Sequence, residues 1–250
     1  MTQLGAHYAR GKMPLITVTA LALVAGCGED TEVPEVGEYA ALVRGQLATA
    51  DLDRARADHD SIAMQGEQTA RDAGDFAHTV LLGTTMLDSI ENEFLAIDRW
   101  TDPDAMADFY ADPMTREAFG SLFASPPTVE LFALAPEWVG WGDMRSGEPH
   151  DPHFVHLALG TLAASDSARA QEAHDQVASG GKQPSIDAGN VAHVVFLGLE
   201  DPRRFVAVDI WSSADNIEPF YTNPDFRAAF EPLFESVTEP VYQSTDWYQW

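Results

Sequence analysis

The sequence predicts an α+β protein in which two β-α-β-β-α-β repeats pack sheet against sheet. Two observations carry this prediction. Residues 38–141 recur as residues 153–250 with gaps only at expected loops, and the strands expected in each copy are apolar along both faces. A repeated unit that cannot bury an apolar face alone buries it against its neighbour. The 250 residues are enough for two such units with a real core.

The repeat emerges when the His-Asp pair at residues 59–60 is aligned with the pair at residues 174–175. This shift of 115 residues becomes 111 after a four-residue contraction. Each copy closes with an acid-Trp-x-x-Trp motif, and a Gly/Pro linker at residues 142–152 joins the copies. Identical residues that align between the copies include Gly45 with Gly160, His78 with His193, Asp98 with Asp209, Trp100 with Trp211, Phe109 with Phe220, and Pro113 with Pro224.

Within each copy, apolar runs and turn residues follow the order strand, helix, strand, strand, helix, strand, which is the ferredoxin-like arrangement. Asp51 is expected to cap the first helix, which carries His59 on its apolar face and ends at Gly74. A proline interrupts the second helical segment, and the acid-Trp-x-x-Trp motif is expected to form the last strand. The ranges expected in the first copy are 39–47, 51–71, 76–82, 94–100, 101 to 108–111, and 114–123; those expected in the second include 154–162, 190–197, 205–211, 212 to 219–222, and 225–235.

The expected strands lack the polar alternation of a sheet that has one face in water. Both faces must therefore be buried. Two sheets packed face to face, with the helices outside, meet this requirement. Two copies in one chain can build the arrangement without a partner chain, so we expect a monomer that is an intrachain pseudo-dimer.

Composition limits the partners and the chemistry. Asp and Glu number 40 against 14 Lys and Arg, and the net charge is −26. Such an acidic surface repels phosphate, so we expect no nucleic-acid partner. The single cysteine excludes an internal disulfide, a cysteine-based zinc site and a CxxC redox centre. The sequence contains no Gly-rich phosphate loop, GxSxG motif or HExxH motif.

The N-terminal residues predict where the protein resides. Basic residues precede an apolar run at 14–25 that is too short to span a bilayer, which is typical of a secretory signal at 1–26. The run ends in Val-Ala-Gly-Cys27, which resembles the lipobox of bacterial lipoproteins, in which the cysteine is lipidated. The resemblance implies a lipid anchor on Cys27, an acidic tether at 27–37 and a place in the cell envelope, periplasmic or at the outer membrane. An ordinary cleaved signal with a coincidental cysteine is the alternative.

The stretch at residues 94–113, with its echo at 205–224, carries a family resemblance. A strand that ends in acid-x-Trp, here Asp98 and Trp100, runs into a helix that is followed by an x-Pro turn. This stretch resembles the antibiotic-biosynthesis-monooxygenase-like group of the dimeric α+β-barrel superfamily, and the resemblance covers nearly the whole mature chain, twice. It implies an intrachain dimeric α+β barrel. The superfamily contains cofactor-free oxygenases, haem-degrading enzymes, haem peroxidases and proteins of no known activity, so the resemblance does not fix the function.

The chain departs from this family at several functional positions. Many members carry one histidine in the second helix and another after its x-Pro turn. These places hold Phe109 and Met114 in the first copy, and Phe220 and Phe226 in the second. The asparagine that haem-degrading members place in the first strand is not evident in either copy. Neither activity carries over residue by residue.

Four histidines are the main candidates for chemistry. His59 and His174 lie on the apolar stripe of the first helix, and His78 and His193 lie early in the second strand. Helix and strand are antiparallel neighbours in this arrangement, so each pair is expected to meet between the helix layer and the sheet. The aspartate that follows each helical histidine is expected to point away. Imidazole serves as a base or a metal ligand, although two imidazoles are an incomplete metal site. Buried histidines with a purely structural role are the alternative.

Asp98 and Asp209 interrupt apolar strands. A buried carboxylate must be hydrogen-bonded or protonated, and a raised pKa would suit a general base. Pairing with His78 and His193 across adjacent strands, or capping of backbone groups, is the structural alternative. The four tryptophans of the closing motifs could line a pocket or pack in the core. The candidate ligand contacts are the aromatic residues Trp100, Trp211, Phe109 and Phe220.

These residues support three hypotheses of different classes. The favoured one is a cofactor-free oxygenase for a small aromatic or quinol-like compound, in which an imidazole or Asp98/Asp209 takes a proton and the resulting carbanion reacts with oxygen. This hypothesis needs no resident cofactor. The second is a non-catalytic protein that binds haem, a divalent metal or an apolar small molecule. The third is a structural envelope lipoprotein whose partner is another protein.

Overall fold

The computed structural model describes residues 37–144 and 153–250. The expected signal segment, Cys27 and the expected tether up to residue 36 lie outside these described residues, as do residues 145–152 of the expected linker. The elements of the first repeat are β1 (Tyr39–Gln46), α1 (Leu52–Asp72), β2 (Asp75–Leu87), β3 (Glu93–Trp100), α2 (Pro103–Ala111), α3 (Pro113–Gly120) and β4 (Thr128–Leu134). Those of the second are β5 (Phe154–Leu162), α4 (Ser167–Asp187), β6 (Asn190–Gly198), β7 (Arg204–Trp211), α5 (Ile217–Tyr221), α6 (Pro224–Phe230), η1 (Glu231–Leu233), β8 (Phe234–Thr238) and β9 (Pro240–Ser244).

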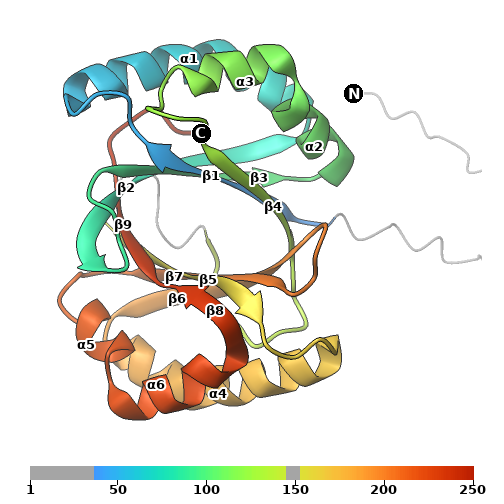
Figure 1. The fold of residues 1–250 in the computed structure, drawn as a ribbon, viewed down its shortest axis with the longest axis vertical. Coiled ribbons are helices and arrows are strands. Elements are labelled where there is room, and N and C mark those ends of the chain that lie inside the picture. Colours follow the sequence, from blue (N-terminus) through green and yellow to red (C-terminus); the bar gives the residue numbers. More distant parts are fainter. Residues whose placement is uncertain (1–36, 145–152) are drawn as a thin grey trace, which may run out of the picture. The chain divides into compact units, whose positions relative to one another are not determined.

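The strands described form one antiparallel sheet that closes on itself. Their order is β7-β6-β4-β1-β3-β2-β9-β5-β8, and a further pairing of β5 with β7 completes the ring. Helices α1 to α3 cover the first repeat and α4 to α6 the second, on the outer side of the sheet (Figure 1). The structure therefore confirms the predicted α+β architecture and merges the two expected sheets into one barrel.

Alternation along each strand separates two kinds of core. In β3, Leu95 and Ile97 face the barrel interior, where they join Leu157, Val208 and other residues of the second repeat in one apolar cluster. Phe94 and Ala96 face the helices of the first repeat. Strands β1, β3, β5 and β7 therefore bury both faces along most of their length, which explains why these segments of the sequence lack polar alternation.

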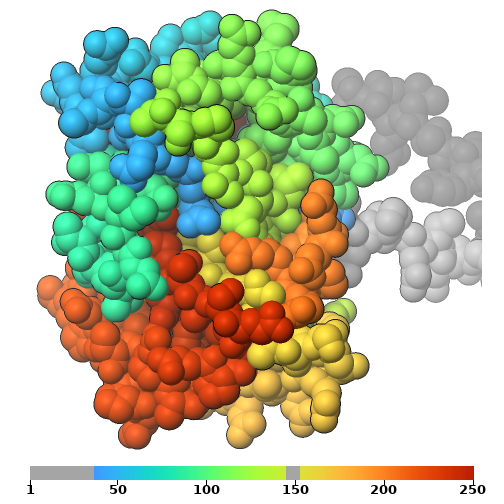
Figure 2. Space-filling view, in the orientation of Figure 1, coloured from blue at the N-terminus to red at the C-terminus, as the bar shows by residue number. Residues whose placement is uncertain are grey.

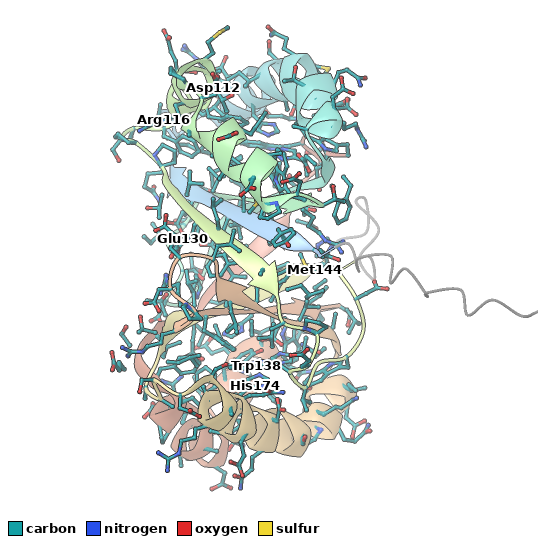
Figure 3. All side chains as sticks on the ribbon, turned by 90° about the vertical axis from the view of Figure 1, so that its right-hand side faces the viewer. Asp112, Arg116, Glu130, Trp138, Met144 and His174 are labelled. Carbon is teal, nitrogen blue, oxygen red and sulfur yellow. The ribbon has the colours of Figure 1, made fainter. Side chains whose placement is uncertain are left out.

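The last strand of each repeat pairs with the other repeat. The end of β4 pairs with β6 at Phe132↔Gly198, and β9 pairs with β2 at Gly83↔Tyr242. Figure 2 shows this exchange at the surface, where red atoms of the last strands lie against teal atoms of β2. Glu130 of β4 (Figure 3) pairs with Arg44 of its own repeat at 3.2 Å and with Arg204 of the other repeat at 2.6 Å, so the second ion pair joins the repeats.

Most expected elements are found, and their caps agree with the sequence. Asp51 accepts a hydrogen bond from the backbone N–H of Arg54 at the start of α1, as predicted. Helix α5 is shorter than its counterpart α2, because Asn216 provides no capping hydrogen bond whereas Asp102 caps α2 with two. Among the helices of the described residues, none is long and apolar enough to cross a membrane.

One expected element is wrong. The acid-Trp-x-x-Trp motifs form no strand; the last strands are β4 and the β8–β9 pair, which precede the motifs. Trp141 makes only an isolated bridge to His193 of the other repeat. The physical reason is that each motif leaves its own sheet and lies under the helices of the other repeat, where large indole rings bury more surface than an edge strand would.

Candidate functional site

Each repeat has its histidine pair sealed by the tryptophan motif of the other repeat, and we call these motifs the exchanged tails (residues 137–141 and 246–250). Trp138 packs beside His174 with ring centroids 5.0 Å apart (Figure 3). Trp141 stacks on His193 at 4.7 Å. In the first repeat, Trp250 stacks on His78 at 4.4 Å in the same way. Neither histidine site is therefore complete within its own repeat.

In the first repeat, four side chains form a continuous chain of hydrogen bonds. Asp60 Oδ1 lies 2.9 Å from His59 Nδ1, and His59 Nε2 lies 3.2 Å from His78 Nε2. His78 Nδ1 donates to Asp98 Oδ1, and the hydroxyl of Tyr110 donates to the other oxygen of Asp98. We call the chain of Asp60, His59, His78 and Asp98 the relay. It joins buried Asp98 to Asp60, whose side chain is 21% exposed.

The relay corrects one expectation. The aspartate after each helical histidine was expected to point away from it, yet Asp60 contacts His59 and Asp175 contacts His174, each at 2.9 Å. Adjacent helical residues do not face each other, but the Asp60 side chain turns back because the N–H of Tyr248, in the exchanged tail, also donates to it at 2.8 Å. The expected meeting of His59 with His78, and of each strand histidine with its aspartate, is present.

Three contacts make up the relay: one between the two Nε2 atoms and one from each Nδ1 atom to a carboxylate. A proton in each contact is one more than two neutral imidazoles carry. Burial lowers the pKa of His59 to about 4, and the nearby charge of His78 adds to this. A proton taken up at Asp98 can leave through both imidazoles to Asp60.

The second repeat repeats the relay with Asp209, His193, His174 and Asp175. His193 Nδ1 lies 2.6 Å from Asp209 Oδ1, and His174 Nε2 lies 3.2 Å from His193 Nε2. Burial lowers the pKa of His174 to about 4, as for His59. The same geometry recurs in both copies, so the relay belongs to the repeated unit and is not a contact of one copy alone.

A further histidine, missed in the sequence analysis, distinguishes the second repeat. His156 is fully buried, lies 3.2 Å from Asp209 Oδ2, and stacks on Tyr221 at 3.6 Å. Its Nε2 lies 3.7 Å from Glu239. Burial alone would lower the pKa of His156, but the hydrogen bond to Asp209 and the nearby carboxylate of Glu239 outweigh it and raise the pKa. Burial alone would raise the pKa of Asp209, but His193 and His156 hold it below its ordinary value. Ala41 occupies the matching place in the first repeat, so alignment of the copies could have revealed this difference.

The relay of each repeat opens into a cavity between the sheet and the helices. The first cavity has a volume of about 260 Å³ and is lined by His78, Asp98, Asp75, Phe109, Phe119, Trp250 and other residues. The second has about 50 Å³ and is lined by His193, Asp209, Phe220, Phe226, Phe230, Trp141 and other residues. One difference between the linings is Phe226, which packs on Phe220 and Phe230 where the first repeat has Thr115.

The predicted aromatic contacts divide into two groups. Phe109 lines the first cavity and Phe220 lines the second. Trp100 and Trp211 are fully buried, and Trp100 packs against Phe109 and Tyr110 behind the cavity wall. Asp75, which the sequence analysis also missed, lines the first cavity and is 3% exposed. The signal for it was the Asp75–Asn190 difference between otherwise similar copies.

The donor groups do not suit a haem or a metal ion. Among the described residues, no cluster of three or more His, Cys, Asp or Glu side chains is arranged to hold a metal. Both ring nitrogens of His78 already contact Asp98 and His59, so neither is free to coordinate iron. The first cavity also lies below the range of about 300–1,000 Å³ that drug-sized ligands occupy. These residues fit a small organic molecule better than a porphyrin.

No protein-family model and no curated protein matches this chain. Solved structures do match. An anthrone oxidase-like protein superposes with a TM-score of 0.60 and 16% identity, covering 87% of this chain and 94% of its own. A candidate monooxygenase from Fusobacterium nucleatum gives 0.58 and 4%, covering 86% and 98%. A candidate chlorite dismutase gives 0.54 and 10%, covering 84% and 95%. The chain therefore has the fold of the dimeric α+β-barrel proteins, including monooxygenase-like ones, as the repeated stretch predicts.

Proposed function

We propose that this protein is a cofactor-independent monooxygenase that acts on a small aromatic or quinol-like compound in the first cavity, and that Asp98 takes the substrate proton. One observation carries the proposal: an uninterrupted relay joins a carboxylate in an apolar cavity to an aspartate at the surface. A buried base that must discharge its proton after each turnover needs such a path. A histidine with a purely packing role does not.

The reaction needs only a proton acceptor and dioxygen. Loss of a proton from an acidic CH₂ group of the substrate leaves a carbanion, which the adjacent aromatic ring stabilises. The carbanion carbon bonds to O₂, and the resulting peroxide takes up a proton. The O–O bond then breaks as water leaves with the second hydrogen of the carbon, and a carbonyl group remains. One oxygen atom ends in the product and the other in water, with O₂ as the oxidant.

The residues of the cavity have distinct roles in this scheme. Asp98 has lone pairs left after it accepts hydrogen bonds from His78 and Tyr110, so it can receive a substrate proton. His78 and His59 move that proton toward Asp60. Phe109 and Phe119 hold an aromatic ring and exclude water from the carbanion. Burial and the negative charge of Asp98 raise the pKa of Tyr110, which keeps its hydroxyl in place as a donor.

The comparisons support this proposal at the level of fold. The anthrone oxidase-like neighbour is named for the oxidation of a CH₂ group between aromatic rings, which is the chemistry written above. Its identity to this chain is 16%, so the activity of this chain rests on the relay and the cavity.

The test is oxygen uptake by the full chain with anthrone as the probe. We expect Asp98→Asn to lower the rate by about 100-fold or more, because a positioned base contributes about 10²–10⁴ to rate. The matched control is Asp209→Asn, which changes the relay of the narrower second cavity and is expected to change the rate less than about threefold. Equal losses in the two variants would contradict the assignment to the first cavity. Saturable binding of anthrone without oxygen uptake would show a binding protein instead.

We also propose that the chain is anchored in the cell envelope by a lipid on Cys27. The apolar run that ends in Val-Ala-Gly-Cys27 supports this proposal. Expression of the full chain in a Gram-negative bacterium with radiolabelled palmitate tests it. We expect the label on the wild-type chain in the membrane fraction and none on Cys27→Ser. Equal labelling of the two proteins, or of neither, would contradict it.

A further inference from the structure

Asp75 is a second carboxyl group in the first cavity. It is the first residue of β2, is 3% exposed, and lines the cavity together with Asp98. Its Oδ1 accepts the backbone N–H of Ala77 at 3.2 Å. The proposed reaction uses Asp98 and assigns nothing to Asp75.

The surroundings of the two carboxyl groups differ. Asp98 accepts hydrogen bonds from His78 and Tyr110. Asp75 has no salt bridge among the described residues. The nearby Arg71 pairs with Glu67 at 2.7 Å instead. Two carboxyl groups in one apolar cavity do not both ionise readily, so Asp75 is the one that keeps its proton.

The titration of Asp75 agrees with this geometry. Burial, and then the charge of Asp98, raise the pKa of Asp75 to about 9. The titratable groups that face it are Asp98 on β3, Arg71 on α1, Tyr110 on α2 and His78 on its own strand, and the side chain of Trp250 in the exchanged tail acts against the rise. The pKa of Tyr110 lies well above 10, so between pH 7 and 10 the ionisation expected in the cavity is that of Asp75.

We propose that Asp75 is the specificity-determining donor of the first cavity, where its carboxyl O–H binds a carbonyl oxygen of an aromatic ketone while Asp98 faces the acidic C–H. This inference rests on the proposed function and names its substrate class: a small aryl ketone with an acidic CH₂ group. As that group loses its proton, negative charge moves to the carbonyl oxygen. A neutral carboxyl donor stabilises such an oxyanion more than it stabilises the ketone.

The second repeat provides a natural reference for this residue. Asn190 occupies the matching place and accepts a hydrogen bond from Trp141 Nε1 at 2.7 Å. An asparagine is therefore compatible with this position of the fold. Asp75→Asn keeps a donor at every pH, whereas Asp75→Ala removes it.

The test compares binding of 1-tetralone and tetralin to the full chain by calorimetry. The two probes have the same carbon skeleton, and only 1-tetralone has a carbonyl oxygen; neither ionises between pH 7 and 10. We expect wild type to prefer 1-tetralone about 2- to 10-fold at pH 7, the usual range for one hydrogen bond, and to lose the preference at pH 10. Asp75→Asn should keep the preference at both pH values, and Asp75→Ala should lack it at both.

Other outcomes would overturn the inference. A preference that Asp75→Ala retains, or that wild type keeps at pH 10, shows that Asp75 is not the donor. Failure of wild type to bind either probe removes the cavity as a site for aryl ketones. Absence of oxygen uptake with anthrone, together with the expected probe preferences, removes the proposed oxygenase and leaves Asp75 as the donor of a binding site. The two proposals therefore fail separately.

Discussion

Each of the two cavities of this chain has its own copy of the same relay, and the cavities differ in the residues that line them. Both have the Asp-His-His-Asp chain with the same Nε2–Nε2 distance of 3.2 Å. The first cavity is lined by Asp75 and Thr115. At the matching positions the second repeat has Phe226, which lines the second cavity, and Asn190, which does not. In the second repeat, His156 and Glu239 form a further ionic network with Asp209. Because the relay is common to both cavities, we expect the residues that line the cavities to decide which one accepts a ligand.

The largest expected effect is on the ionic network of the second repeat. His156→Ala removes the imidazole that lies 3.2 Å from Asp209 and 3.7 Å from Glu239, which then keep His193 and Arg227 as their ion-pair partners. Removal of one partner of a buried ion pair costs about 3–5 kcal/mol. We expect that loss in the free energy of unfolding measured with urea near pH 6. The alanine itself is compatible with the fold, because Ala41 has this place in the first repeat.

The pH dependence of the same variant sharpens the comparison. The raised pKa of His156 means that its stabilisation is complete below the ordinary value near 6.5 and declines as pH rises through the folded value. The pKa values of Asp209 and Glu239 are lowered, so their part is present above about pH 4 and is lost as pH falls through the folded values. An effect of His156→Ala that is the same at pH 3 and pH 6 would contradict this account.

Asp75→Asn is expected to raise the free energy of unfolding, whereas His156→Ala lowers it. The folded chain keeps a proton on Asp75 between pH 4 and about 9, while the unfolded chain has released it, so wild-type stability falls as pH rises through this window. The variant removes this loss, which amounts to at most about 1.4 kcal/mol per pH unit. We expect equal melting temperatures at pH 4 and a higher one for the variant at pH 8. A difference that does not vary with pH would show that Asp75 is ionised in the folded state.

The smallest effect concerns the cavity walls. Thr115→Phe gives the first cavity the side chain that narrows the second, and we expect at least about a tenfold weaker binding of anthrone, equivalent to about 1.4 kcal/mol. The reciprocal variant, Phe226→Thr, should open the second cavity and add a second binding event in calorimetry. Undiminished binding by Thr115→Phe would place the ligand elsewhere.

Local sequence patterns predicted much of the fold. The copies aligned at His59 and His174 because duplicated residues keep their spacing, and Asp51 marked the start of α1 because its side chain caps the backbone. Strands without polar alternation indicated burial on both faces. The pairing of His78 with Asp98 was also accessible, since the two residues lie opposite each other in adjacent strands.

The remaining features depend on contacts between residues far apart in the chain. No local pattern indicates that Trp250 stacks on His78, because this contact requires the last strand to pair with the other repeat. Asp60 turns toward His59 only when the tail provides the N–H of Tyr248. Asp75 and His156 were overlooked because the alignment was used to find residues that agree, whereas these residues differ between the copies.

The exchanged tails also affect how such a chain can evolve. When two identical subunits form a barrel, one gene specifies both, and every substitution changes both sites at once. Here each half has its own codons, so one site can narrow while the other stays open. Yet Trp247 and Trp250 pack on histidines of the half that does not encode them. The halves are therefore free to specialise but not to separate, and a gene fragment that encodes either half alone would yield a site without its seal.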